Sequence, residues 1–136
     1  MRALDKKATA ILNLISDGIA SGEMNKIERS ITFEPVVVEN IGNTNSGSEL
    51  ISVAHYYKQN GDLVPDPEMV FIKQEDKIYA VYFRNSLMEQ FAVKPNYYQY
   101  SAVNTKLQSS ITTFANYWLN EILDQQNLVL ENSANG

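Results

Sequence analysis

The residues whose chemistry could support catalysis or metal binding gather in the middle of the chain. Residues 55–68 hold the only histidine, His55, and three carboxylates, Asp62, Asp66 and Glu68. Imidazole and carboxylate groups bind divalent ions such as Mg²⁺ or Mn²⁺, and a bound ion can activate water for hydrolysis. The spacing matches no established ligand pattern, however. The opposing interpretation is that Asp62 and Asp66 accept hydrogen bonds from the backbone of their own turn.

A second pattern in the same region is typical of restriction-type nucleases. Pro65-Asp66 followed by Glu75-Asp76-Lys77 fits the P-D…E-x-K arrangement, whose charged side chains share a metal ion with the scissile phosphate. That chemistry needs Glu75 and Lys77 beside Asp66 on one strand face. Glu75-Asp76 instead has the position of a hairpin turn, and short patterns of this kind recur by chance.

His55 could also act alone as a general acid or base, because histidine titrates near neutral pH. It lies in register with apolar residues on a predicted strand, however, which favours a packed, hydrogen-bonded side chain. We expect one ring nitrogen to bond to Asp62, Asp66 or Glu68, which would raise the histidine pKa and pin the following loop. The candidate functional cluster is therefore His55, Tyr57, Asp62, Asp66 and Glu68, and no catalytic residue is assigned.

Two segments at the ends of the chain have the periodicity of amphipathic helices. Apolar residues recur three or four positions apart over Leu4–Ile19, and Gly22 can end this helix in the left-handed conformation. The same spacing covers Leu107–Leu123, where Asn104 or Ser101 can cap the start. Since both helices have one apolar stripe, we expect them to share a core with a sheet.

The middle of the chain predicts a sheet. Four segments rich in β-branched and aromatic residues are expected to form strands: Ile31–Ile41, Leu50–Lys58, Met69–Gln74 and Lys77–Arg84. Residues 42–48 and 60–69 are expected to be loops, the second one ordered. The prediction is an α+β fold of order α-β-β-β-β-α, with a four-stranded, largely antiparallel sheet and both helices on one face. It forms a single domain over residues 1–130, followed by a frayed tail at 131–136.

The central motif resembles that of a known family. The string AHYYKQNGDLVPDPEMVF at residues 54–71 and the YFRN of residues 82–85 are similar to small uncharacterised proteins of bacteria, their conjugative elements and phages. The resemblance covers roughly residues 50–92. It implies a domain of unknown function with a link to mobile elements, and it implies no mechanism.

Tyrosines offer a candidate interaction surface. Tyr97, Tyr98 and Tyr100 follow a proline, and aromatic side chains are enriched in protein interfaces. A base-stacking platform would need interleaved arginine or lysine, and the net charge of −5 argues against general nucleic-acid binding. The chain has no cysteine and no apolar run that could span a membrane, so we expect a cytoplasmic protein.

Two hypotheses about function remain. The favoured one is a non-enzymatic interaction or accessory protein, without a cofactor, that binds another protein or a second copy of itself. The alternative is a small metal-dependent hydrolase or nuclease that uses His55, Asp62, Asp66 and Glu68.

Overall fold

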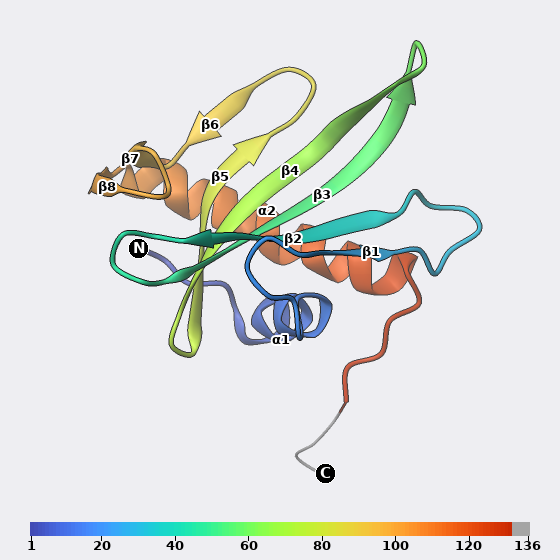
Figure 1. Cartoon of the computed structure of the whole chain (residues 1–136), viewed down its shortest axis with the longest axis horizontal. Helices are drawn as coiled ribbons and strands as arrows, with labels where there is room; N and C mark the ends of the chain where they lie inside the picture. Colours follow the sequence, from blue (N-terminus) through green and yellow to red (C-terminus); the bar gives the residue numbers. More distant parts are fainter. Residues whose placement is uncertain (132–136) are drawn as a thin grey trace.

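A computed structural model describes residues 1–131, with a helix at each end and eight strands between them (Figure 1). The helices are α1 (Lys6–Ile15) and α2 (Thr105–Gln125). The strands are β1 (Met24–Ile27), β2 (Val36–Asn43), β3 (Glu49–Gln59), β4 (Asp62–Gln74), β5 (Lys77–Arg84), β6 (Glu89–Phe91), β7 (Val93–Pro95) and β8 (Tyr100–Val103). The predicted tail lies outside the described residues, apart from Glu131.

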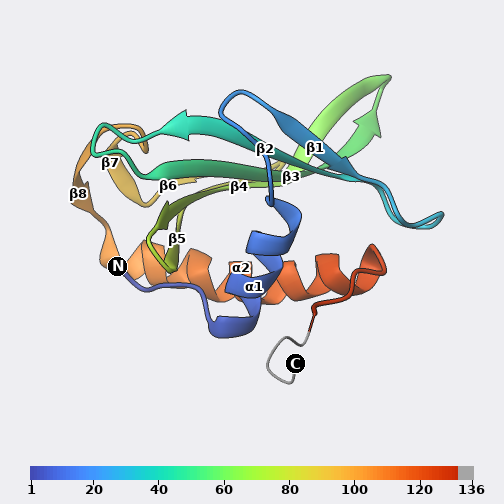
Figure 2. The same cartoon turned by 60° about the horizontal axis from the view of Figure 1, so that its bottom comes forward.

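The main sheet has six strands rather than the four predicted. Its order is β1-β2-β3-β4-β5-β6, every neighbouring pair is antiparallel, and β7 and β8 form a separate two-stranded ribbon. Both helices lie on the same face of the main sheet, as predicted (Figure 2). The added edge strands were missed because β1 and β6 are short and rich in polar residues. Pairing with a neighbouring strand, rather than local composition, makes them extended.

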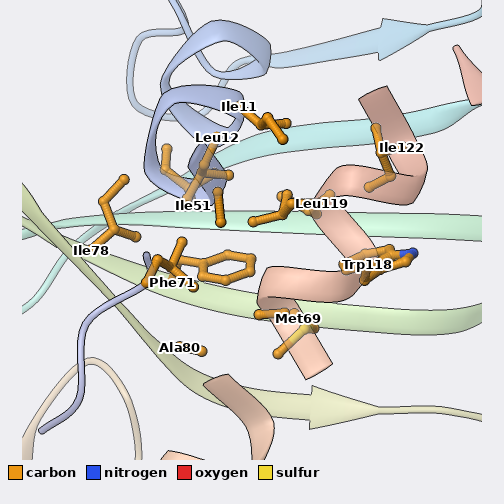
Figure 3. Close-up of a cluster of buried hydrophobic side chains, with 14 of the residues drawn as sticks. Ile11, Leu12, Ile51, Met69, Phe71, Ile78, Ala80, Trp118, Leu119 and Ile122 are labelled. Carbon is orange, nitrogen blue, oxygen red and sulfur yellow. The ribbon is translucent and has the colours of Figure 1, made fainter. Parts of the chain in front are cut away.

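The core fills the space between the sheet and the two helices. Strand residues such as Ile51 and Phe71 meet Leu12 of α1 and Leu119 of α2, and all four are fully buried (Figure 3). Trp118 belongs to this core and is 4% exposed, as its place on the apolar stripe of the helix indicates. We call this side of the sheet the helix face and the opposite side the open face.

The helix ends differ from the prediction at one point. Asp5 caps α1 by accepting a hydrogen bond from the Ala8 amide, and Asn104 caps α2 in the same way with Leu107. The first helix ends at Ile15 instead of continuing to Ile19. The helix cannot continue to Ile19 because Gly18 has a φ of +74°, a left-handed conformation that an α-helix cannot contain.

Residues 60–69, predicted as an ordered loop, belong mostly to strand β4. Only Asn60 and Gly61 form the turn, with φ angles of 53° and 86°, and β4 begins directly after them. A strand tolerates Pro65 and Pro67 here because the hairpin extends past its neighbours. Strand β2 pairs with β3 only as far as His55, and β5 pairs with β4 only from Glu68 onward. The end of the hairpin is therefore a two-stranded ribbon with free edges, where a missing amide hydrogen does little harm (Figure 1).

The open face is covered at one end only. A second cluster of apolar residues forms where β4 and β5 meet the β7–β8 segment, and it includes Val70, Ile72, Val81 and Val93. At the other end, toward the β3–β4 turn, no helix or strand of residues 1–131 covers the open face (Figure 2). Within residues 1–131, no helix is long and apolar enough to cross a membrane.

Candidate functional site

The four residues of the predicted metal cluster do not come together. His55 points to the helix face against Trp118, whereas Glu68 lies on the open face, where Arg84 donates to it. Asp62 is exposed beside the hairpin turn. Among the residues that the structure describes, no three histidine, cysteine or acidic side chains are placed to hold a metal ion. The metal hypothesis for these four residues is therefore wrong. The register shift between Ala54 and Tyr56 places Glu68 opposite Ala54, on the other face from His55, and of the three carboxylates only Asp66 lines the same cleft as His55.

The nuclease pattern fails for a related reason. Glu75 and Asp76 form the turn between β4 and β5, and both are exposed together with Lys77. Asp66 lies near the opposite end of β4. At roughly 3.3 Å per residue along the strand, Asp66 and Glu75 are about 30 Å apart. They cannot share a metal ion.

His55 is packed as predicted but not hydrogen-bonded as predicted. Its ring meets Trp118 edge to face, with 5.7 Å between centroids, and its Nε2 atom is buried without a hydrogen-bond partner among the described residues. Burial lowers the pKa of His55 below its ordinary value, and the negative charge of Glu34 offsets this only in part. The expected brace to Asp62, Asp66 or Glu68, with a raised pKa, is thus contradicted.

His55 lines a cleft of about 350 Å³ on the helix face, which we call the helix-side cleft. Aromatic side chains from three parts of the chain form its walls: Phe33 from the β1–β2 loop, Tyr57 from β3, and Tyr117 and Trp118 from α2. Trp118 is buried, but Tyr117 is 61% exposed and Phe33 is also open to solvent. The cleft therefore presents aromatic surface that the fold itself does not cover.

Three carboxylates, Glu34, Asp66 and Glu121, line the same cleft. The Tyr117 hydroxyl donates a hydrogen bond to Glu121 at 3.1 Å. Because the hydroxyl is uncharged, this bond does not neutralise the Glu121 carboxylate. The lysine and arginine ion pairs found in residues 1–131 involve other acidic side chains, namely Glu28, Glu49 and Glu68. The cleft thus combines aromatic walls with negative charge that no described cation neutralises.

Gln126 fixes the loop that carries Glu34 and Phe33. Its fully buried amide accepts a hydrogen bond from the Arg29 amide at 2.8 Å and donates to the Glu34 carbonyl at 2.9 Å. Asn127 adds a bond to the Arg29 carbonyl at 2.9 Å. Both ends of the β1–β2 loop are thereby tied to the C-terminal end of α2, and one wall of the cleft is held in place.

The open face carries a different polar group, centred on Glu68. Arg84 Nη2 donates to Glu68 Oε1 at 2.7 Å, and Ser52 Oγ donates to Glu68 Oε2 at 3.3 Å. Burial raises the pKa of Tyr56 nearby, and the charge of Glu68 raises it further. Burial also raises the pKa of Tyr82, with help from its 2.6 Å hydrogen bond to Glu89. Both tyrosines are therefore neutral at neutral pH, and Glu68 is paired with Arg84.

Beyond this polar group, the uncovered end of the open face holds a groove of about 580 Å³, the open-face groove. Its apolar lining comes from β1, the β1–β2 loop, β2 and the β3–β4 hairpin: Met24, Pro35, Val37, Tyr56 and Leu63. Leu63 is 64% exposed. Lysines and glutamates stand at its rim, and Glu34 and Tyr56 line both this groove and the helix-side cleft.

The three tyrosines of the predicted interface lie at the covered end of the open face. Tyr97 packs against Tyr82 and Phe91, with ring centroids 5.5 Å and 6.2 Å apart, and Tyr100 packs against the same cluster. The Tyr98 hydroxyl donates to the Ile41 carbonyl at 3.0 Å. Packing within the chain thus accounts for much of their surface, and their role as an interface stays a prediction.

Several residues of these sites were not predicted. Glu34 had no distinguishing neighbours, and Arg84 appeared only inside the YFRN string. The position of Tyr117 and Glu121 one turn apart on α2 could have indicated a shared exposed face. Nothing in the sequence says which strand that face meets.

Comparisons with known proteins identify a family for this chain and no function. A family model described as "Domain of unknown function (DUF6908)" matches residues 6–128, a range that includes both helices and all eight strands. No curated protein and no solved structure matches the chain. Since the match extends over most of its length, the chain belongs to this family of domains of unknown function.

Proposed function

We propose that this protein is a non-enzymatic interaction protein that binds a protein partner at the uncovered end of its sheet. The observation that carries the proposal is the open-face groove. Apolar side chains from the four adjacent strands β1 to β4 line it, and Met24 and Leu63 among them are exposed. It lies on the half of the open face that no other helix or strand of residues 1–131 covers. Clustered apolar surface of this kind is typical of binding sites, whereas apolar residues scattered singly over a protein surface are normal and indicate no site.

The net charge of the chain favours a different protein over a second copy of the chain. The net charge of −5 makes two copies repel each other, whereas a basic partner would be attracted. An accessory role in a mobile element, which the family resemblance implies, would be of this kind. The separation of His55 from Glu68 supports binding rather than hydrolysis.

Site-specific photocrosslinking in cells that naturally produce the protein tests the proposal. A photoreactive p-benzoylphenylalanine replaces Leu63 in the groove, and the matched control replaces Leu87, which is 87% exposed but lies in the β5–β6 loop. We expect a discrete protein adduct from position 63 and none from position 87.

Equal crosslinking at both positions, or none at position 63, would contradict the proposal. An adduct of twice the chain mass of 15.4 kDa would show that a second copy occupies the groove, and the assignment to a different protein would then be wrong.

A further inference from the structure

The helix-side cleft has the properties of a site for an organic cation. The faces of tyrosine, tryptophan and phenylalanine rings attract cations, and this attraction strengthens where the cation is partly shielded from water. Glu34, Asp66 and Glu121 add negative charge that no lysine or arginine of residues 1–131 neutralises.

The geometry rules out a compact metal ion as the ligand. In the described part of the chain, the acidic and histidine side chains are not close enough in any group of three to bind one. The cleft volume of about 350 Å³ lies at the lower end of the range for ligand sites, roughly 300 to 1,000 Å³. An extended side chain with a cationic head suits this space and the spread of the carboxylates.

Among organic cations, the guanidinium group fits best. It is planar and stacks on aromatic faces, and its fork of N–H donors pairs with carboxylates, whereas an ammonium is compact and strongly hydrated. We propose that the helix-side cleft binds an arginine side chain of a partner protein. This inference rests on the proposed function in one respect, that the arginine belongs to a protein.

Two features favour a protein segment over free arginine. Phe33 and Tyr117 are exposed aromatic walls of the cleft, and residues next to the arginine in a chain would cover surface that a single arginine leaves open. Glu34 and Tyr56 also line the open-face groove, so a segment that crosses this end of the sheet contacts both sites.

The cleft is built before the ligand arrives. Gln126 holds the loop with Glu34 and Phe33 against α2, and the Tyr117–Glu121 hydrogen bond holds one carboxylate beside an aromatic ring. Fixed walls reduce the entropy lost on binding, which favours affinity for a single side chain.

The test uses a short capped peptide, acetyl-Gly-Gly-Arg-Gly-Gly-amide, and matched peptides with lysine or citrulline in place of arginine. Trp118 is the only tryptophan and His55 the only histidine, so tryptophan fluorescence and the histidine ring NMR signals report on this cleft alone. We expect a saturable change with the arginine peptide, a weaker one with lysine, and none with citrulline, which has the same shape without the charge.

Two variants remove charge from the cleft without changing its shape. Asp66→Asn and Glu121→Gln should each raise the Kd for the arginine peptide by about fivefold, the upper range for one partly exposed ion pair. Asp124→Asn is the matched control, because it removes a carboxylate of α2 that is exposed outside the cleft, and it should leave the Kd unchanged. NMR spectra of each variant establish that the fold is retained.

The inference is overturned if citrulline binds as well as arginine, if lysine equals arginine, or if Asp66→Asn and Asp124→Asn behave alike. No saturable change up to about 10 mM peptide would also overturn it. The proposed function fails separately. Met24→Ser, introduced into the protein that carries the photoreactive residue at position 63, should abolish partner crosslinking through the groove and leave peptide binding intact. Failure of the arginine peptide to bind, with crosslinking preserved, would remove only the arginine site.

Discussion

Glu68 and Arg84 lie directly opposite each other on β4 and β5, and Arg84 Nη2 donates to Glu68 Oε1 at 2.7 Å. This pairing depends on a single irregularity. An uninterrupted hairpin counted back from the Glu75-Asp76 turn would place Phe83 opposite Glu68. The register shift between Val70 and Phe71 inserts one residue in β5, so Phe83 faces the helices and Arg84 reaches the open face.

We expect Glu68 and Arg84 to stabilise the fold together by up to about 1 kcal/mol, since Arg84 is 41% exposed and water screens the pair. A double-mutant cycle of Glu68→Gln and Arg84→Gln, measured by urea denaturation, checks this coupling energy. The same cycle on Lys26 and Glu28, an exposed pair at 3.9 Å, should give a value near zero. Equal coupling in the two cycles would show that the short hydrogen bond on the open face adds nothing.

The fold class and the long elements could be predicted because their apolar residues repeat at the helix or strand period. Short strands such as β1 and β6 could not, because three or four residues carry too little pattern and become extended only through pairing. Residues 60–69 were misassigned for a specific reason. Pro65 and Pro67 indicate a loop unless the edge of the strand is unpaired. Whether it is unpaired depends on where β2 stops pairing with β3 and where β5 stops pairing with β4.

The candidate site was predicted less well than the fold. The sequence indicated that His55 shares a face with Tyr57, and the structure places both in the helix-side cleft. It grouped His55 with Glu68 because they are close in the chain. The register shift between Ala54 and Tyr56 places Glu68 opposite Ala54, however, so Glu68 and His55 lie on opposite faces of the sheet. Their true neighbours, Trp118 and Arg84, come from α2 and β5, and only tertiary structure brings them there.

Trp118 should be among the most costly residues of the chain to truncate. Its ring is 4% exposed and stacks near Phe114, so Trp118→Ala should lower the free energy of unfolding by about 3–5 kcal/mol. The adjacent Tyr117, 61% exposed, is the matched control, and Tyr117→Ala should cost less than about 1 kcal/mol. Urea denaturation followed by circular dichroism measures both. Similar losses for the two variants would mean that Trp118 is not a core residue.

Gly61 should stabilise the β3–β4 turn, because glycine adopts the left-handed conformation of this position without steric strain. Its φ is 86°, so Gly61→Ala should cost about 1 kcal/mol, and Gly61→Asn should cost less because asparagine tolerates this region better. The ribbon beyond His55 and Glu68 is free of neighbouring strands, so the effect should be local. Amide hydrogen exchange should accelerate at Tyr57 and Val64 while Phe71 stays protected. Uniform acceleration throughout the sheet would contradict this.

His55 should make stability depend on pH with a definite sign. Burial lowers the pKa of His55 below its ordinary value of 6.5 in the folded protein. Below pH 6.5 the unfolded chain therefore binds the proton more readily than the folded one, and stability falls as pH falls until the folded pKa is reached. Wild type should lose more stability than His55→Gln between pH 7 and about 5, as measured by urea denaturation at each pH.

NMR titration of the single imidazole separates the charges that act on it. Glu34→Gln should lower the pKa of His55 further, because the Glu34 carboxylate is the charge that raises it. Asp62→Asn should leave the pKa unchanged, since Asp62 is exposed beside the hairpin turn. If Asp62→Asn lowered the pKa instead, a carboxylate of the hairpin would be paired with the imidazolium. A pKa at or above 6.5 in wild type would show that burial does not dominate, and the ring would then have to be open to water or hydrogen-bonded in its charged form.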